Sequence, residues 1–156
     1  MKLITFTKAF VTIIASAAVC MAATSSEAKD YVTTQETQAR AYSLSVVTEN
    51  PKKTIYFAGQ TGHIGADGNP ITDFDSQARR AFSLIKETLE KSGAKMSDIV
   101  SMTVFITDVR NGKHFADIRK EFFPDGKYPG SALIAVDGLM GQSMIEIQGV
   151  AVVDGK

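Results

Sequence analysis

The chain has 156 residues, which suits a single hydrophobic core because one domain usually organises about 100 to 200 residues. Its 17 basic residues balance its 17 acidic residues, and no segment concentrates Lys and Arg among aromatic side chains. Since nucleic-acid binding depends on a basic surface that neutralises phosphates, this composition argues against a nucleic-acid partner.

The N-terminal segment has the pattern of a secretory signal peptide. Lys2 and Lys8 precede an apolar run over residues 9–23, and small residues and a change to polar composition follow it. The run is shorter than the roughly 20 apolar residues that span a bilayer. We therefore expect a signal peptide over residues 1–28 that is cleaved after Ala22 or Ala28, a periplasmic or secreted protein, and no membrane association after cleavage.

Cys20 is the single cysteine of the chain. Cleavage would remove it, which excludes disulfides, a thiolate nucleophile and cysteine-ligated metals from the mature protein. Val19 stands directly before Cys20, where a lipoprotein signal needs a small residue, and this disfavours a lipid anchor. The two histidines, His63 and His114, lie in different predicted segments without a metal-ligand spacing, so we expect no metal site.

Residues 29–156 contain no linker, low-complexity tract or repeat, and we expect them to form one domain. Runs of β-branched and aromatic residues predict strands over residues 41–47 and 54–58. The turn residues between these two runs favour an opening hairpin.

The most regular pattern in the chain is that of an amphipathic helix. A dense turn signal over residues 65–70 precedes it, Asp73 or Asp75 is its candidate cap, and Gly93 marks its end. Its apolar positions share one helical face; they are Ala78, Ala81, Phe82, Ile85 and Leu89.

The second half of the chain predicts three strands and a shorter helix. Apolar residues alternate over residues 100–106, in the order Val100, Met102, Val104 and Ile106, and this favours a half-buried strand. Residues 131–136 and 144–153 favour two closing strands. A shorter helix is predicted between the strands over residues 100–106 and 131–136. It ends at Pro124, and its apolar stripe is Phe115, Ile118 and Phe122.

The order strand, strand, helix, strand, helix, strand, strand predicts an α+β fold, with a mixed sheet and both helices packed on one of its faces. The other face would carry residues such as Phe105. Because large exposed apolar surfaces usually mark interfaces, we expect the protein to form a homo-oligomer.

Five short motifs on these elements resemble, in the same order, those of the RidA/YjgF family. They are Ala41-Tyr42-Ser43, Ala58-Gly59-Gln60, Asp108 after the strand ending Val104-Phe105-Ile106-Thr107, Pro129-Gly130-Ser131 and Ile145-Glu146-Ile147. The resemblance implies a chorismate-mutase-like fold, a homotrimer and ligand clefts between its subunits. It also implies hydrolysis of enamines and imines derived from amino acids, without a cofactor.

The resemblance assigns the catalytic role to Glu146, which would position a water molecule. Strand alternation turns its carboxylate away from Ile145 and Ile147, and in a cleft this carboxylate could orient water or shuttle a proton. The alternative is a solvated residue of an edge strand. Tyr42 corresponds to a cleft tyrosine that stacks on or hydrogen-bonds the ligand; the alternative is a half-buried interface aromatic. Gly59 joins the substrate-binding set, where it would allow close backbone packing.

Two positions depart from the family pattern. Ser131 stands where the family has an arginine that clamps the substrate carboxylate, and a serine offers no bidentate, permanently charged contact. Backbone groups near Ser131 would have to bind the substrate instead. Ala58 stands where the family often has a serine. We expect four arginines to lie on the solvated surface and not to replace the clamp: Arg79, Arg80, Arg110 and Arg119.

Two functions of different classes stay open. The first is an exported enamine or imine deaminase that hydrolyses a C=N bond to a carbonyl and ammonia, with Glu146 positioning the water. The second is a non-catalytic trimer that binds a small metabolite, which Ser131 and Ala58 favour. A ribonuclease role, attributed to some relatives, is disfavoured by the balanced charge.

Overall fold

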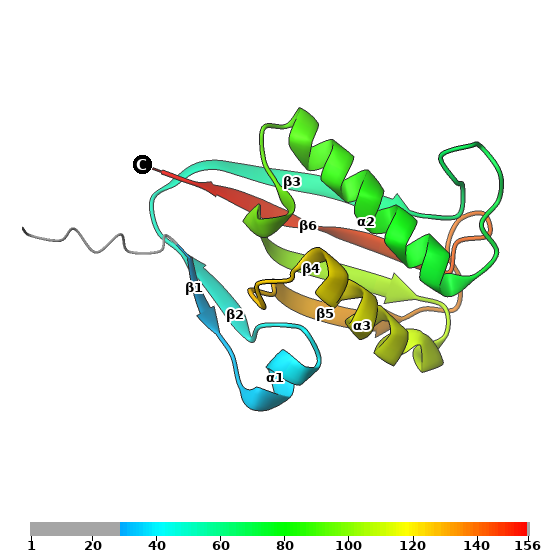
Figure 1. The fold of residues 1–156 in the computed structure, drawn as a ribbon, viewed down its shortest axis with the longest axis horizontal. Coiled ribbons are helices and arrows are strands. Elements are labelled where there is room, and N and C mark those ends of the chain that lie inside the picture. The colour runs from blue at the N-terminus through cyan, green and yellow to red at the C-terminus, as the bar shows by residue number, and fades with distance from the viewer. Residues whose placement is uncertain (1–28, 156) are drawn as a thin grey trace, which may run out of the picture.

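A four-stranded mixed sheet forms the centre of the structure, and the two longer helices lie on one of its faces (Figure 1). The computed structural model describes residues 29–155; the predicted signal peptide, both of its cleavage sites and Cys20 lie outside the described residues. The elements in chain order are β1 (Lys29–Val32), α1 (Gln35–Ala39), β2 (Ser45–Thr48), β3 (Pro51–Thr61), α2 (Phe74–Lys91), η1 (Met96–Asp98), β4 (Ile99–Ile106), η2 (Val109–Asn111), α3 (Gly112–Phe122), β5 (Gly130–Ala135) and β6 (Ile145–Asp154).

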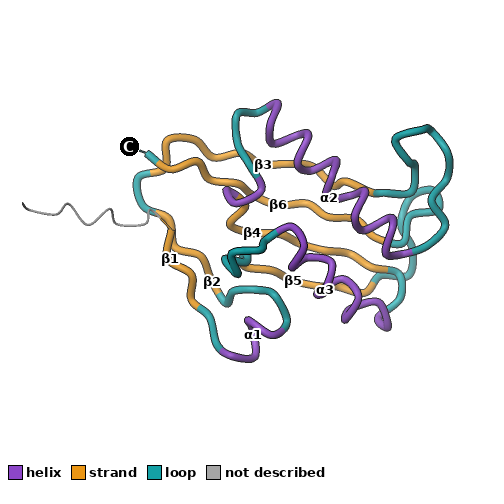
Figure 2. The backbone as a smooth tube through the Cα atoms, viewed as in Figure 1, coloured by secondary structure: helices purple, strands orange, loops and turns teal. Residues whose placement is uncertain are grey.

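The strands of the central sheet follow the order β3-β6-β4-β5 (Figure 2). The last strand of the chain, β6, lies between β3 and β4 and runs antiparallel to both, whereas β5 runs parallel to β4. The predicted mixed sheet is therefore confirmed, and β3 and β5 are its edges.

Helix α2 begins and ends where the sequence predicts. The Asp73 side chain caps it, accepting a 2.8 Å hydrogen bond from the Ser76 backbone N–H, and Gly93 follows its end with a φ of +70°. The five predicted apolar positions of this helix are all fully buried. Because they share one face, they fasten the helix to the sheet.

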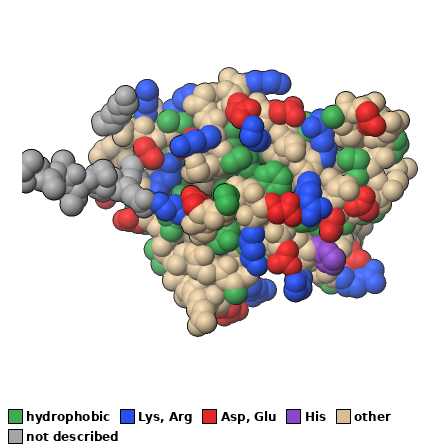
Figure 3. Space-filling view, viewed as in Figure 1, with side chains coloured by type: hydrophobic (Ala, Val, Ile, Leu, Met, Phe, Trp, Pro, Cys, Tyr) green, Lys and Arg blue, Asp and Glu red, His purple; other side chains and the backbone are tan. Residues whose placement is uncertain are grey.

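Aromatic side chains join the two helices on the same side of the sheet. The ring of Phe82 on α2 stacks against Phe122, with the ring centroids 4.5 Å apart, and against Phe115 at 5.9 Å. The outer side of these helices carries intermixed Lys, Arg, Asp and Glu side chains, as Figure 3 shows. Both helices thus cover one face of the sheet, as predicted.

The buried amide of Gln77 connects α2 to the segment that leads into β6. Its Nε2 donates to the carbonyls of Ile71 and Gln142, and its Oε1 accepts a 2.8 Å hydrogen bond from the Met144 backbone N–H. Three of the amide's hydrogen-bonding positions are therefore satisfied. This arrangement fixes the entry to β6 next to the helix.

The predicted opening hairpin is wrong. Strand β2 pairs with β1, and β3 pairs with β6, so the two runs that we expected to pair with each other belong to different sheets. The strand predicted from residue 41 also begins late, because Ala41 adopts a left-handed φ of 58° directly after the short helix α1. Thr34 and Thr37 cap this helix reciprocally.

The predicted alternation in β4 is shifted at its first position. A register irregularity between Ile99 and Ser101 puts Ile99, and not Val100, on the buried side, after which Met102 begins the regular inward positions. Within residues 29–155, no helix is long and apolar enough to span a membrane.

The close approach of β3 to α2 generates a prediction about stability. A Cβ added to buried Gly62 would lie 1.9 Å from the Gln77 carbonyl oxygen, so backbone would have to move. We expect Gly62→Ala to lower the free energy of unfolding by roughly 1–3 kcal/mol or more. Gly138→Ala is the matched control, because nothing lies within 4 Å of its added Cβ. Urea unfolding of both variants measures the effect, and equal stabilities would contradict this packing.

Candidate functional site

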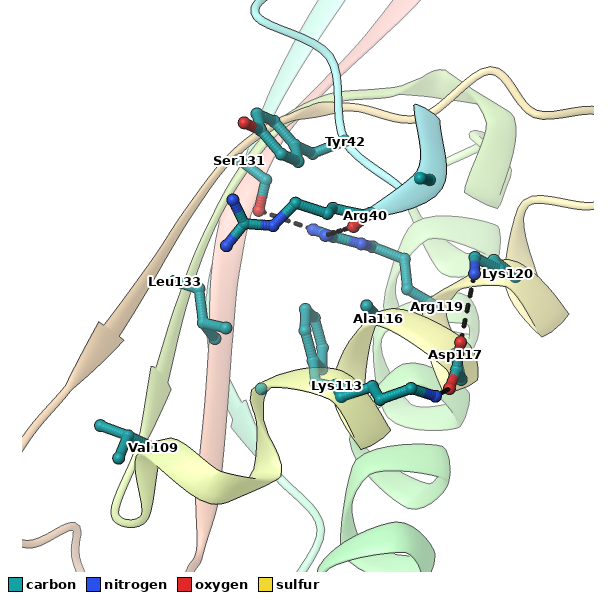
Figure 4. Close-up of a pocket in the computed structure, with 13 residues that line it drawn as sticks. Arg40, Tyr42, Val109, Lys113, Ala116, Asp117, Arg119, Lys120, Ser131 and Leu133 are labelled. Atoms are coloured by element: carbon teal, nitrogen blue, oxygen red, sulfur yellow. Dashed lines mark hydrogen bonds and ion pairs between the residues drawn. The ribbon is translucent and has the colours of Figure 1, made fainter. Parts of the chain in front are cut away.

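A cavity of about 800 Å³ opens beside the edge strand β5, between the end of α1 and helix α3 (Figure 4). Arg40 and Tyr42 line it from the segment that follows α1. Arg119 lines it from α3, and Ser131 and Leu133 line it from β5. A cavity of this size accommodates a small organic molecule.

Arg119 is buried at the base of this cavity, with only 4% of the residue exposed. Its Nη1 donates a 2.7 Å hydrogen bond to the Ser131 hydroxyl, and its Nη2 donates a 3.0 Å bond to the Arg40 carbonyl. The guanidinium also lies 4.8 Å from the ring centroid of Phe115. The prediction that Arg119 lies on the solvated surface is therefore wrong.

The position of Arg119 on its helix explains the burial. It follows Phe115 by four residues and Ile118 by one, so its side chain lies on the face of α3 that packs inward. This spacing was the sequence signal that could have identified Arg119 as a site residue. Residue type alone favours exposure for an arginine, and that preference does not hold here.

The Arg119 charge has no carboxylate partner within residues 29–155. Burial lowers the pKa of its guanidinium to about 10, an effect that Tyr128 and Tyr42 partly oppose. The group stays protonated at neutral pH. Its Nε is also buried without a hydrogen-bond partner in this part of the chain. An uncompensated buried cation is costly, which makes it a strong candidate for ligand binding.

The rest of the lining adds positive charge. Among residues 29–155, the cavity is lined by four basic side chains, Arg40, Lys113, Arg119 and Lys120, and by one acidic side chain, Asp117. Asp117 accepts hydrogen bonds from Lys113 at 2.7 Å and from Lys120 at 3.1 Å, so one carboxylate is shared by two ammonium groups (Figure 4). The excess positive charge favours an anionic ligand.

Two of the predicted substrate-binding residues, Tyr42 and Ser131, meet in this cavity. Ser43 holds them together: its hydroxyl donates to the Tyr128 carbonyl at 2.6 Å and its backbone N–H to the Pro129 carbonyl at 3.1 Å. These bonds fasten the segment after α1 against the start of β5. Tyr42 itself is half-buried.

The other two predicted residues, Gly59 and Glu146, lie together in a different place. A Cβ added to Gly59 would lie 1.9 Å from the Glu146 Oε1, so the carboxylate occupies the space that a larger residue at position 59 would fill. Gly59 thus permits a close approach, but of a side chain and not of the backbone that we expected from the sequence. The approaching group is the Glu146 side chain, which is half-buried on β6.

Strand register puts these two groups on opposite faces of the sheet. Ser131 is paired with Met102, which is buried beneath the helices. Glu146 is paired with Phe105, an odd number of residues farther along the same strand. Since paired residues share a face and successive residues alternate, Ser131 faces the helices and Glu146 faces away from them. One chain alone does not bring the four predicted residues together.

The remaining candidates lie outside both groups. Arg79 and Arg110 are exposed as predicted, and each contacts an acidic side chain, whereas Arg80 is half-buried against Glu87. The Nδ1 of His63 lies 3.0 Å from the hydroxyls of Thr61 and Ser143. Among the described residues, no cluster of three or more His, Cys, Asp or Glu side chains could hold a metal ion.

Comparisons with known proteins show to which family this chain is similar. The family model described as endoribonuclease L-PSP matches residues 33–153. A 2-iminobutanoate/2-iminopropanoate deaminase of Dermatophagoides farinae is 32% identical over 114 residues, covering 72% of this chain and 86% of that protein. The protein of the same name from Bos taurus is 29% identical over 112 residues, covering 71% and 79%.

A solved structure shows the same fold at lower identity. YyfB of Yersinia pestis, a member of the conserved Rid protein family, superposes with a TM-score of 0.72 at 19% identity, covering 81% of this chain and 99% of that one. The family model, which spans most of the described domain, together with these relatives shows that the chain belongs to the RidA/YjgF family.

Proposed function

We propose that this protein is an enamine or imine deaminase that works in clefts between the subunits of a homotrimer. The observation that carries the proposal is the Glu146 carboxylate, which lies over Gly59 on the sheet face that the helices leave uncovered. Two relatives that carry the name deaminase support it.

Hydrolysis of an imine needs two proton transfers. Water adds to the carbon of the C=N bond and loses one proton, which passes to the nitrogen and leaves a carbinolamine. The carbinolamine hydroxyl then loses its proton as the carbonyl forms, and a second proton reaches the nitrogen so that the C–N bond breaks and ammonia leaves. A carboxylate held within reach can accept the proton from water and return it to nitrogen. Glu146 supplies this group, and the products are a carbonyl compound and ammonia.

The split of the site between two faces supports the inter-subunit cleft. Ser131 and Tyr42 of one copy would meet Gly59 and Glu146 of the next in a heterologous, head-to-tail contact. Such a contact forms a closed trimeric ring when each copy is rotated by a third of a turn from the next. The uncovered face also carries exposed apolar side chains. Tyr56 is 79% exposed and Ile134 is 42% exposed, which is typical of a surface that another copy covers.

A non-catalytic, metabolite-binding trimer is the second candidate. The observation that favours it is Ser131, because the arginine clamp that the family resemblance implies is missing at this position. Turnover by the wild-type protein distinguishes the two functions.

We predict that Glu146→Gln lowers kcat for imine hydrolysis by roughly 10²- to 10⁴-fold, because the amide cannot accept the proton from water. Gly59→Ala should also lower kcat, since the added methyl group displaces the carboxylate. The assay follows 2-oxo acid formation, above the spontaneous rate, from imines that an amino-acid oxidase generates in situ.

Gln148→Ala is the matched control, because Gln148 lies on the same strand and the same face as Glu146. It should retain wild-type turnover. A wild-type rate equal to that of buffer would exclude the deaminase in favour of the binding trimer. A Glu146→Gln variant as active as the wild type would remove Glu146 from the mechanism.

We further propose that the protein is exported and that the signal peptide is removed. Cleavage at either predicted site leaves β1 intact, because this strand begins at Lys29. Expression of the full chain in a Gram-negative host, followed by periplasmic extraction and intact-mass measurement, should give an N-terminus at Ala23 or Lys29. A protein that keeps the whole segment and stays in the cytoplasmic fraction would contradict export.

A further inference from the structure

We propose that Arg119, acting through the Ser131 hydroxyl, is the carboxylate-recognising group of the cavity beside β5, in the place of the arginine that the family resemblance implies at position 131. This assigns a specificity-determining residue to the proposed deaminase and rests on that function for its catalytic meaning. Binding itself is measurable without turnover.

The first support is the state of Arg119. Its guanidinium is almost wholly buried, keeps its charge at neutral pH and has no carboxylate partner among residues 29–155. Burying a charge without a counter-ion destabilises the folded protein. A ligand carboxylate that arrives in the cavity would supply the missing negative charge.

The second support is the geometry of the hydrogen bond between Arg119 and Ser131. The Ser131 oxygen accepts the 2.7 Å bond from Nη1, so the hydroxyl hydrogen stays available to donate to a ligand. A guanidinium that donates to the oxygen polarises the O–H bond and makes the hydroxyl a stronger donor. Ser131 therefore carries the effect of the buried charge to the cavity surface (Figure 4).

The third support is the rest of the lining, which fits an organic acid. The surplus of basic side chains over acidic ones, which in the described part of the chain are represented by Asp117, favours an anion. Two exposed apolar side chains, Val109 and Leu133, line the same cavity and would contact an aliphatic chain. An inorganic anion could use the charges but not these apolar contacts.

The location of the charge thus differs from the family pattern. The family arginine would project from β5 at position 131, whereas here the cation comes from α3 and a serine separates it from the ligand. An arginine at position 131 would bring a second guanidinium against Arg119, and two like charges in one buried place repel each other. Serine at 131 and arginine at 119 are consistent with each other in this chain.

The test is binding, by isothermal titration calorimetry, of 2-oxobutanoate and of its neutral amide to the purified protein. The wild type should bind the acid at least about tenfold more tightly than the amide. Inorganic phosphate, titrated separately, should bind more weakly than the acid.

The decisive variant is Ser131→Asp, which gives Arg119 a carboxylate within the chain. It should raise Tm by a few degrees, because the buried cation gains a partner. It should also weaken 2-oxobutanoate binding by about tenfold or more, since the charge is no longer available. A more stable protein that no longer binds the acid is not a misfolded one.

Two matched controls accompany this variant. Ser131→Asn has nearly the same shape as Ser131→Asp without the charge, so it should leave Tm close to that of the wild type. Arg79→Gln removes an exposed arginine outside the cavity that pairs with Glu121, so it should bind the acid as the wild type does.

Three results would overturn the proposal: equal affinity for the acid and the amide, tighter binding of phosphate than of the acid, or Ser131→Asp binding the acid as the wild type does. Failure of this site is separable from failure of the deaminase. Wild-type protein that binds 2-oxobutanoate but hydrolyses no imine supports the carboxylate site and contradicts the deaminase.

Discussion

The arrangement of this protein depends on one constraint, the alternation of side chains across a sheet that helices cover on only one face. Side chains of successive residues in β4 and β6 point to opposite sides of the sheet. Each side chain therefore lies either in the core beneath the helices or on the open face. Ser131 is paired with Met102 and lies on the helix side, whereas Glu146 is paired with Phe105 and lies on the open side. A site that uses both residues therefore needs a second copy of the chain.

The buried guanidinium of Arg119 is the other unusual feature, and the proposed carboxylate site would explain it. A hydrophobic residue of similar size at position 119 would avoid the cost of desolvating a charge. The groups that surround the cation are all neutral, so they do not compensate its charge; they are the Ser131 hydroxyl, the Arg40 carbonyl and the Phe115 ring. Stability given up at a binding site in this way is common, since the ligand supplies the missing interaction.

Sequence patterns predicted the parts of the fold that have strong periodicity, and local exceptions explain the rest. Helix α2 and the central strands follow from apolar spacing and from the cap at Asp73. Helix α1 is too short for periodicity, and its Thr34–Thr37 capping pair lacks the usual acidic residue. The pairing of β2 with β1 depends on tertiary contacts, and no local sequence pattern indicates it. For the site, the family motifs predicted four residues, of which the cavity contains Tyr42 and Ser131, and Arg119 was missed because residue type alone favours exposure for an arginine.

The most direct test of the account mixes two variants, each of which carries one impaired half of the proposed site, and measures turnover at low substrate concentration. Glu146→Gln lacks the carboxylate that we propose for catalysis, and Ser131→Asp gives Arg119 a carboxylate partner within the chain. If each site combines the cavity of one subunit with Glu146 of the next, randomly mixed trimers should recover about a quarter of wild-type turnover, because one ordered subunit pair in four carries both intact halves. Co-refolding the two variants and measuring imine hydrolysis gives the answer. Activity no higher than that of the separate variants, in trimers shown to be mixed, would contradict a site shared between subunits.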